Sequence, residues 1–189
     1  MLDRREFVAR LLVDRGDILV VTGLGTATFD VAACGDHPLN FYIWSGMGCT
    51  AMVGLGLALA RPDRRVAVIT GDGDLLMGMG SLATVGVKQP NNLSIVVLDN
   101  GHYGATGMQP SHTGAGIDLA GTAESCRFQH VASVSKIDAA AEARALLHTR
   151  QGPIFIHARV KADDRQPIIP SRDGYAIKHR FMQASAEKL

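Results

Sequence analysis

Two side chains that carry oxygen ligands each follow an apolar run of the length expected for a buried strand. Asp72 lies between two glycines after the run from Arg65 to Thr70, and Asn100 comes shortly after the run from Leu93 to Leu98. A carboxylate, a neutral amide oxygen and a loop carbonyl suit Mg²⁺, a hard cation that usually completes its octahedron with water and substrate phosphates. The residue types therefore predict a magnesium site that also accepts a phosphorylated ligand.

The glycines around Asp72 predict where the phosphates bind. Gly71 and Gly73 have no side chain, so their backbone N–H groups can approach a diphosphate closely. A helix is expected to begin soon afterwards, and its N-terminus adds favourable partial charge. Asp74 places a second carboxylate near the same group. We therefore expect a cradle for magnesium and diphosphate in this stretch.

Regular elements must bring Asp72 and Asn100 together. A helix expected from about Leu75 to Val87 lies between the two strand-like runs, and the polar sequence from Gln89 to Asn92 separates it from the second run. A parallel βαβ crossover puts the carboxyl ends of both strands at one edge of the sheet, where ligands of open α/β sheets bind. The pattern predicts an α/β fold with three α/β/α layers around a mostly parallel central sheet.

The other elements are expected around this unit, from apolar runs for strands and from amphipathic or small-residue patterns for helices. Further strands are predicted over residues 17–22, 41–44, 131–135 and 154–160. Further helices are predicted over residues 3–15, 50–60, 118–130, 138–149 and 175–187, with Asp138 as the cap of the fourth. We expect one domain over residues 1–189, with residues 163–189 as a peripheral tail that can dock on another subunit.

Composition narrows the class of protein. The chain has 189 residues, 47% of them hydrophobic and 20% charged, as is ordinary for a soluble α/β domain. Its 19 basic and 18 acidic residues form no long run of either sign, so we expect neither a nucleic acid nor a membrane as partner. The N-terminus has no apolar signal region, and a cytoplasmic location follows by default.

The three cysteines argue against several kinds of site. Cys34, Cys49 and Cys126 are odd in number and include no closely spaced pair. This spacing disfavours a disulfide framework, a zinc site and a cysteine-ligated iron–sulfur cluster. We expect buried free thiols.

One combination of residues points to a known cofactor. The chain joins the triplet Gly71-Asp72-Gly73 to Asn100 and to the sequence Gly101-His102-Tyr103-Gly104. This combination resembles the thiamine-diphosphate motif of the thiamine-dependent decarboxylase and synthase superfamily. The resemblance implies thiamine diphosphate and Mg²⁺ as cofactors, with Asp72, Asn100 and the main-chain oxygen of His102 as metal ligands. The implied cofactor-binding residues of the motif are Gly71, Gly73, Asp74, Asn100, Tyr103 and Gly104, although Asp74 departs from the small residue that is common after the triplet.

A glycine-rich turn from Ser45 to Thr50 precedes the triplet by a distance that is also similar to the superfamily. The resemblance implies that its bulky apolar residue, Met47, wedges between the two rings of the cofactor and belongs to the catalytic machinery. It also implies that the main-chain oxygen of Ser45 or Gly46 accepts a hydrogen bond from the cofactor's amino group. A core methionine is the alternative for Met47, because thioether side chains readily fill irregular gaps.

Two loops are further candidates for ligand contacts. Residues 22–27 either approach the cofactor or form a plain turn, since the third glycine of a dinucleotide-binding motif is absent. Residues 105–114 follow the predicted metal site, so we expect them beside the reacting carbon. His112 is the candidate catalytic residue there, and an exposed or structural histidine is the alternative. The candidates for hydrogen bonds to a substrate carboxylate or distal anion are Tyr103, Gln109, Ser111, His112 and Thr113.

The activating glutamate of the superfamily has no evident counterpart in this chain. The resemblance implies that this glutamate belongs to a pyrimidine-binding domain. Here none of the glutamates follows a buried strand, and all lie in helix-like contexts: Glu6, Glu124, Glu142 and Glu187. We therefore expect a pyrimidine-binding partner subunit that carries the glutamate, in a hetero-oligomer of α₂β₂ or larger size.

Three further stretches, residues 75–84, 106–113 and 177–182, resemble the sulfopyruvate and phosphonopyruvate decarboxylases. This narrower resemblance implies nonoxidative decarboxylation of a 3-substituted pyruvate, a small 2-oxoacid, to an aldehyde. Two alternatives stay open. One is a subunit of a thiamine-diphosphate-dependent carboligase or 2-oxoacid oxidoreductase, and the other is a non-catalytic regulatory homologue.

Overall fold

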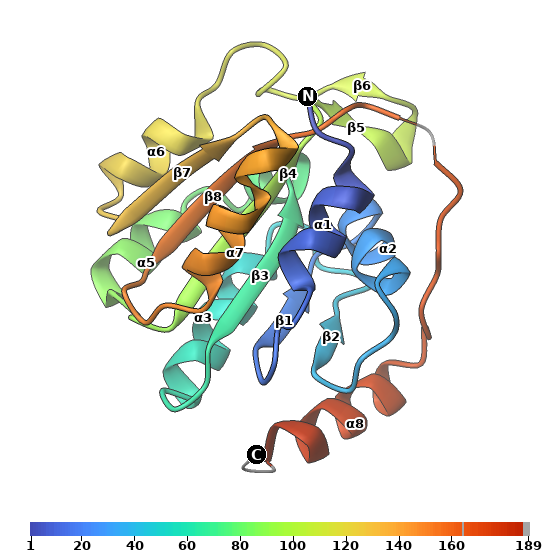
Figure 1. The fold of residues 1–189 in the computed structure, drawn as a ribbon. Helices are drawn as coiled ribbons and strands as arrows, with labels where there is room; N and C mark the ends of the chain where they lie inside the picture. The colour runs from blue at the N-terminus through green and yellow to red at the C-terminus, as the bar shows by residue number, and fades with distance from the viewer. Residues whose placement is uncertain (164, 187–189) are drawn as a thin grey trace.

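A six-stranded sheet, parallel at every pair of neighbouring strands, forms the centre of the protein (Figure 1). The computed structural model describes residues 1–163 and 165–186. The strand order is β2-β1-β3-β4-β8-β7. The strands are β1 (Leu19–Thr22), β2 (Asn40–Tyr42), β3 (Val66–Gly71), β4 (Leu93–Asp99), β7 (His130–Val134) and β8 (Ile154–Arg159).

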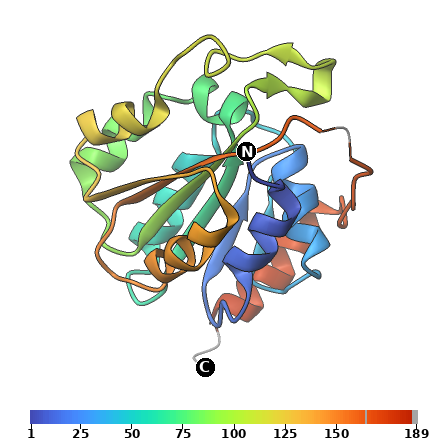
Figure 2. The ribbon, with the colours of Figure 1, turned by 45° about the horizontal axis from the view of Figure 1, so that its top comes forward.

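Helices cover both faces of this sheet, as the two views in Figures 1 and 2 show. Those on the first face are α1 (Arg4–Leu12), α2 (Thr26–Ala33) and α7 (Ala140–Leu147). Those on the second face are α3 (Thr50–Ala60), α4 (Asp72–Met77), α5 (Ser81–Lys88) and α6 (Leu119–Ser125). The predicted α/β fold with three α/β/α layers and a parallel sheet is confirmed.

The strands are apolar along most of their length because helices bury them from both sides. Alternate residues of β3 enter opposite cores: Ala67 and Ile69 pack with α1 and α2, whereas Val66 and Val68 pack with α3 and α5. Within the described residues, no helix combines the length and the apolar character needed to cross a membrane.

The prediction of one helix over residues 75–87 is wrong, because the chain forms two helices there, α4 and α5. The break falls at Gly78, where the main chain passes so close to the turn before α3 that a Cβ atom would overlap the carbonyl oxygen of Gly48. Close packing between two segments therefore overrides the local helical pattern.

Other predicted details also need correction. The first helix ends at Leu12, since Asp14 adopts a left-handed backbone with φ of 52°. The helix α2 was not predicted; it begins directly after the glycine-rich turn, with Gly25 as an N-cap that makes no side-chain hydrogen bond. Asp138 does not cap α7, because it lies inside the 3₁₀ turn η2 (Ile137–Ala139). The cysteines are free, but Cys34 and Cys49 are exposed and Cys126 is half-buried, so the expectation of buried thiols is wrong.

The C-terminal segment runs beside α2 and ends in α8 (Gly174–Ala186), next to β2 (Figure 1). Along the way Arg4 binds the carboxylate of Asp163 at 2.5 Å, and the indole N–H of Trp44 donates to the carbonyl oxygen of Ser171 at 2.8 Å. Phe181 of α8 is buried against Phe41. The segment predicted as a peripheral tail is thus anchored on this chain, and the predicted end of its helix, Glu187, lies outside the described residues.

Candidate active site

A cleft opens at the carboxyl edge of the sheet, between the ends of β1, β3 and β4. In the strand order, β1 has β2 on one side and β3 on the other, so the direction of the chain connections reverses at β1. Open α/β sheets bind ligands at such a switch point. The cleft has a volume of about 110 Å³. Its lining comprises residues 24–26, 71–74 and 102–106, together with Met47, Leu98 and Asn100.

The structure therefore brings together almost all of the predicted site residues. The triplet around Asp72, the motif from Asn100 to Gly104, and Met47 line one cleft although they come from three separate loops. Ser45 and Gly46 lie on the same turn as Met47 but are exposed and stand outside the lining. Residues 24–26 also line the cleft, so the turn after β1 is placed to contact a ligand.

Asp72 is buried at the first position of α4, with 2% of its surface exposed. The hydroxyl of Ser111 donates to Asp72 Oδ2 at 2.5 Å. The single hydrogen of the Thr113 hydroxyl is shared between this oxygen, at 3.1 Å, and Asp99 Oδ1, at 2.7 Å. Burial raises the pKa of Asp72, the Ser111 hydrogen bond opposes the rise, and the nearby carboxylate of Asp99 adds to it. A cation beside Asp72 would offset both effects that disfavour its charge.

Asn100 and His102 form a tight turn on the opposite wall of the cleft. The backbone N–H of His102 donates to the side-chain oxygen of Asn100 at 2.9 Å, and His102 Nδ1 lies 2.9 Å from the main-chain oxygen of Asn100. Gly101 between them has a φ of 71°, a value that favours glycine. An amide oxygen has two lone pairs, so the oxygen of Asn100 can accept this hydrogen bond and still bind a metal ion.

A second carboxylate, Asp99, lies directly beneath these residues and was not predicted as part of the site. Its oxygens accept hydrogen bonds from the Thr113 hydroxyl at 2.7 Å, from the Gly101 N–H at 2.9 Å and from His157 Nε2 at 2.7 Å. Burial opposes ionisation of Asp99, but these hydrogen bonds, that of His157 foremost, hold its pKa below the usual range. No sequence pattern indicates His157, because it comes from β8 and only the strand order brings it beside β4.

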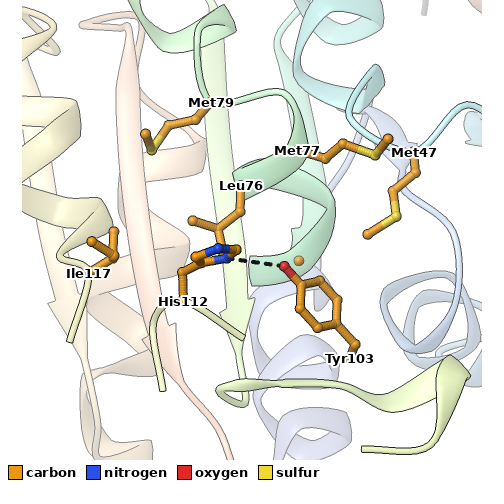
Figure 3. A pocket seen from close by; sticks show the side chains of 8 residues that line it. Met47, Leu76, Met77, Met79, Tyr103, His112 and Ile117 are labelled. Carbon is orange, nitrogen blue, oxygen red and sulfur yellow. Dashed lines mark hydrogen bonds between the residues drawn. The ribbon is translucent and has the colours of Figure 1, made fainter. Parts of the chain in front are cut away.

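In the loop from Ala105 to Gly114, some side chains are buried and others face the solvent. Ser111 and Thr113 point inward and are 2% and 4% exposed, so the expectation that they bind substrate is wrong. They instead tie the loop to Asp72 and Asp99. His112 between them points outward, and its Nδ1 lies 3.3 Å from the hydroxyl of Tyr103 (Figure 3).

A second, apolar cavity of about 490 Å³ adjoins the cleft on this side. Figure 3 shows Tyr103 and His112 at its centre, surrounded by aliphatic and thioether side chains. Met47, Gly73 and Tyr103 line both the cavity and the cleft, so Met47 stands where the two hollows meet. Met47 is half-buried and belongs to neither core cluster, which argues against the interpretation as a core methionine.

Residues 23–158 match a family model that is described as "Thiamine pyrophosphate enzyme, C-terminal TPP binding domain". The chain belongs to this family. The predicted resemblance to the thiamine-diphosphate superfamily is thereby confirmed, and the fold around the cleft is that of a domain that binds this cofactor.

Individual relatives agree with the family assignment. The chain is 36% identical to the sulfopyruvate decarboxylase subunit beta of Methanothermobacter thermautotrophicus over 97% of this chain and 95% of that one. It is 38% identical to the phosphonopyruvate decarboxylase of Streptomyces viridochromogenes over 77% of this chain but only 36% of that longer protein. The narrower predicted resemblance to these two kinds of decarboxylase is also confirmed.

A solved structure supports the fold. The thiamine diphosphate-dependent 4-hydroxybenzoylformate decarboxylase of Rhodococcus jostii RHA1 superposes with a TM-score of 0.69 at 22% identity. The match covers 87% of this chain and 33% of that one. At this identity the likeness concerns the fold alone.

Proposed function

We propose that this chain is the diphosphate-binding subunit of a heteromeric thiamine-diphosphate-dependent 2-oxoacid decarboxylase. Its substrate is a 3-substituted pyruvate of the sulfopyruvate or phosphonopyruvate type, which loses CO₂ without oxidation and yields an aldehyde. The observation that carries the proposal is the cleft in which Asp72, Asn100 and Met47 meet. Near full-length similarity to a sulfopyruvate decarboxylase subunit supports the choice of reaction.

The donor set of the cleft fits Mg²⁺ and a diphosphate. Asp72 offers the carboxylate oxygen that Ser111 and Thr113 do not occupy, Asn100 offers its amide oxygen, and His102 offers its main-chain oxygen. Gly71 has open space on the side where a Cβ atom would lie, so phosphate oxygens can come close to the backbone there.

Thiamine diphosphate, when bound, supplies the carbon nucleophile and the electron sink that decarboxylation of a 2-oxoacid requires. This chain's residues hold and orient the reacting groups. Met47 lies between the cleft and the apolar cavity, where it would contact the cofactor and orient it. Tyr103 and His112 present hydroxyl and imidazole groups to the cavity in which the substrate lies.

Two features support a partner subunit. Part of the lining of the adjoining apolar cavity is exposed, at Met77, His112 and Ile117, so a partner subunit has an open side to cover. The described glutamates, Glu6, Glu124 and Glu142, are exposed on helices and none lines the cleft or the apolar cavity. The partner supplies the activating glutamate, within an assembly of α₂β₂ or larger size.

The proposal is tested by CO₂ release from sulfopyruvate, phosphonopyruvate and pyruvate in the presence of thiamine diphosphate and Mg²⁺. The chain is assayed alone and as the complex co-purified with its native partner. We expect release only from the complex, with the aldehyde as product. Full activity of the isolated chain would refute the need for a partner. An acyl transfer or ligation product would favour the carboligase or oxidoreductase alternative, and cofactor binding without turnover of any 2-oxoacid would favour a regulatory homologue.

A further inference from the structure

Asp74 is the unusual residue of the site, because it adds a carboxylate two residues after Asp72. It is 6% exposed and lies at the start of α4. The backbone N–H of Gly48 donates to its Oδ1 at 2.6 Å, and the hydroxyl of Thr50 donates to its Oδ2 at 2.6 Å. The Thr70 hydroxyl donates to the same Oδ2. Both oxygens are therefore engaged by groups of the protein itself.

The donors show which segments Asp74 joins. Thr70 comes from the end of β3, whereas Gly48 and Thr50 belong to the turn that carries Met47 and to the start of α3. The cluster is tightly packed, since a Cβ atom on Gly23 would lie 2.6 Å from Asp74 Oδ2. Asp74 thus links the turn after β2 to the helix after β3 at the point where three loops converge.

The Met47 turn is held from two sides. Asp74 binds the N–H of Gly48, and Gly78 at the end of α4 packs directly on the Gly48 carbonyl. The methyl group of Met47 lies near the backbone of Gly73, where an added Cβ atom would stand 3.6 Å from it. The position of Met47 over the cleft therefore depends on a turn whose N–H and C=O groups are both fixed by α4.

We propose that Asp74 is a positioning residue: its carboxylate holds the Gly48 N–H and thereby places Met47 between the cleft and the apolar cavity. It is a ligand of neither Mg²⁺ nor the diphosphate. A carboxylate is suited to this role because it only accepts hydrogen bonds, and its two oxygens already accept three from the protein. The effect of Asp74 on catalysis rests on the proposed function, whereas its effect on the position of Met47 does not.

The first test needs no substrate, cofactor or partner. The full chain is labelled with ¹³C at the methionine methyl groups, and the Met47 signal is assigned by its loss in Met47→Leu. In Asp74→Ser, which leaves the Gly48 N–H without its acceptor, we expect the Met47 signal to shift and broaden while that of Met182, on α8, stays unchanged. Asp74→Asn keeps an acceptor oxygen for Gly48 and is expected to leave the Met47 signal close to that of the wild type.

Asp118→Ser is the matched control. Asp118 accepts a hydrogen bond from the Gly121 N–H at 3.0 Å at the start of α6, away from the cleft, and its replacement removes the same kind of bond. It should leave the Met47 signal unchanged. If Asp74→Ser does not fold, Thr50→Val removes one donor to Asp74 without changing the size of the side chain, and a smaller shift of the Met47 signal is expected. An unchanged Met47 signal in folded Asp74→Ser would overturn the proposal.

The second test uses the complex with the partner subunit. Asp74→Ser should lower kcat about 10- to 100-fold, the order of loss seen when a reacting geometry is displaced by about 1 Å. The affinities for Mg²⁺ and thiamine diphosphate should stay within about threefold of the wild type, since both Asp74 oxygens are engaged by the protein and, under this proposal, Asp74 is not the cofactor ligand that the family resemblance implied. Loss of Mg²⁺ affinity with kcat preserved would instead identify Asp74 as a cofactor ligand. If no 2-oxoacid is decarboxylated even by the wild type, the proposed function fails and the methyl signals still decide the role of Asp74.

Discussion

Asp72 and Asp74 lie two residues apart in the first turn of α4, and both are buried, yet they connect to opposite walls of the cleft. Asp72 accepts hydrogen bonds from Ser111 and Thr113, in the loop that follows β4. Asp74 accepts them from Gly48 and Thr50, in the turn that precedes α3. One short helix therefore organises the loop beside the substrate cavity and the turn that carries Met47.

The two carboxylates differ in how completely the protein satisfies them. At Asp74 both oxygens have donors, whereas at Asp72 the two hydroxyls converge on Oδ2 alone. Asp72 also faces the charge of Asp99, and burial raises its pKa. A buried carboxylate with a like charge nearby is suited to a cation. The number of protein donors that a carboxylate already has, more than its position in the motif, therefore separates a metal ligand from a positioning residue.

The largest effect is expected from Asp72→Asn. Changes to residues that merely support metal ligands typically cost about 10- to 100-fold in metal affinity, and loss of a charged ligand should exceed that range. We expect magnesium-dependent binding of thiamine diphosphate to the complex to weaken by at least about 100-fold. Calorimetric titration measures it. Asp74→Asn serves as the matched variant, and equal losses in both would abolish the distinction drawn between the two carboxylates.

Ser111→Ala should have an intermediate effect on metal binding at Asp72 and no effect on the hydrogen bonds of Asp74. Without the hydroxyl, Asp72 loses its shorter hydrogen bond and the loop loses one of its two anchors to that carboxylate. We expect Mg²⁺ affinity to fall about 10-fold, at the lower end of the effect of supporting residues. The Met47 methyl signal should not change, because Ser111 makes no contact with the Asp74 cluster among the hydrogen bonds of the described residues. A shifted Met47 signal would mean that the two walls are coupled.

Much of the cleft could be predicted because its residues sit at strand ends. The apolar runs before Asp72 and Asn100 mark β3 and β4, and parallel strands deliver their carboxyl ends to one edge. The family resemblance then added Met47 and His102. These predictions depend on local pattern and on a recurring motif, and both are readable along the chain.

The supporting contacts could not be read in this way because they depend on strand order and side-chain direction. His157 reaches Asp99 only because β8 pairs with β4. Ser111 and Thr113 look like substrate contacts in a polar loop, but the turn that begins at His112 leaves both of them buried and His112 exposed. The break between α4 and α5 has the same origin, since Gly78 is required by its approach to Gly48 and not by the helix itself.

The smallest expected effect concerns the stability of the metal-free chain, and it has opposite signs for the two carboxylates. Asp72→Asn removes a charge that burial and Asp99 disfavour, and its amide oxygen can still accept from Ser111 and Thr113. We expect the free energy of unfolding to rise by roughly 1 kcal/mol. In Asp74→Asn, the amide NH₂ group, itself a donor, faces the hydroxyl donors of Thr50 and Thr70. The free energy of unfolding should therefore fall by a similar amount, about 1 kcal/mol. In a chain of this size, each corresponds to about 2–4 °C in Tm.

The pH dependence separates this explanation from a simple packing effect. Because the pKa of Asp72 is raised in the folded protein, its ionisation costs folding free energy at pH values above that pKa. The cost disappears as the pH falls through the folded pKa, where the wild-type carboxyl is also neutral. The advantage of Asp72→Asn should therefore be largest near neutral pH and shrink as the pH is lowered toward the ordinary range of an aspartate. An advantage that stays constant with pH in thermal unfolding would show that burial of charge at Asp72 is not its cause.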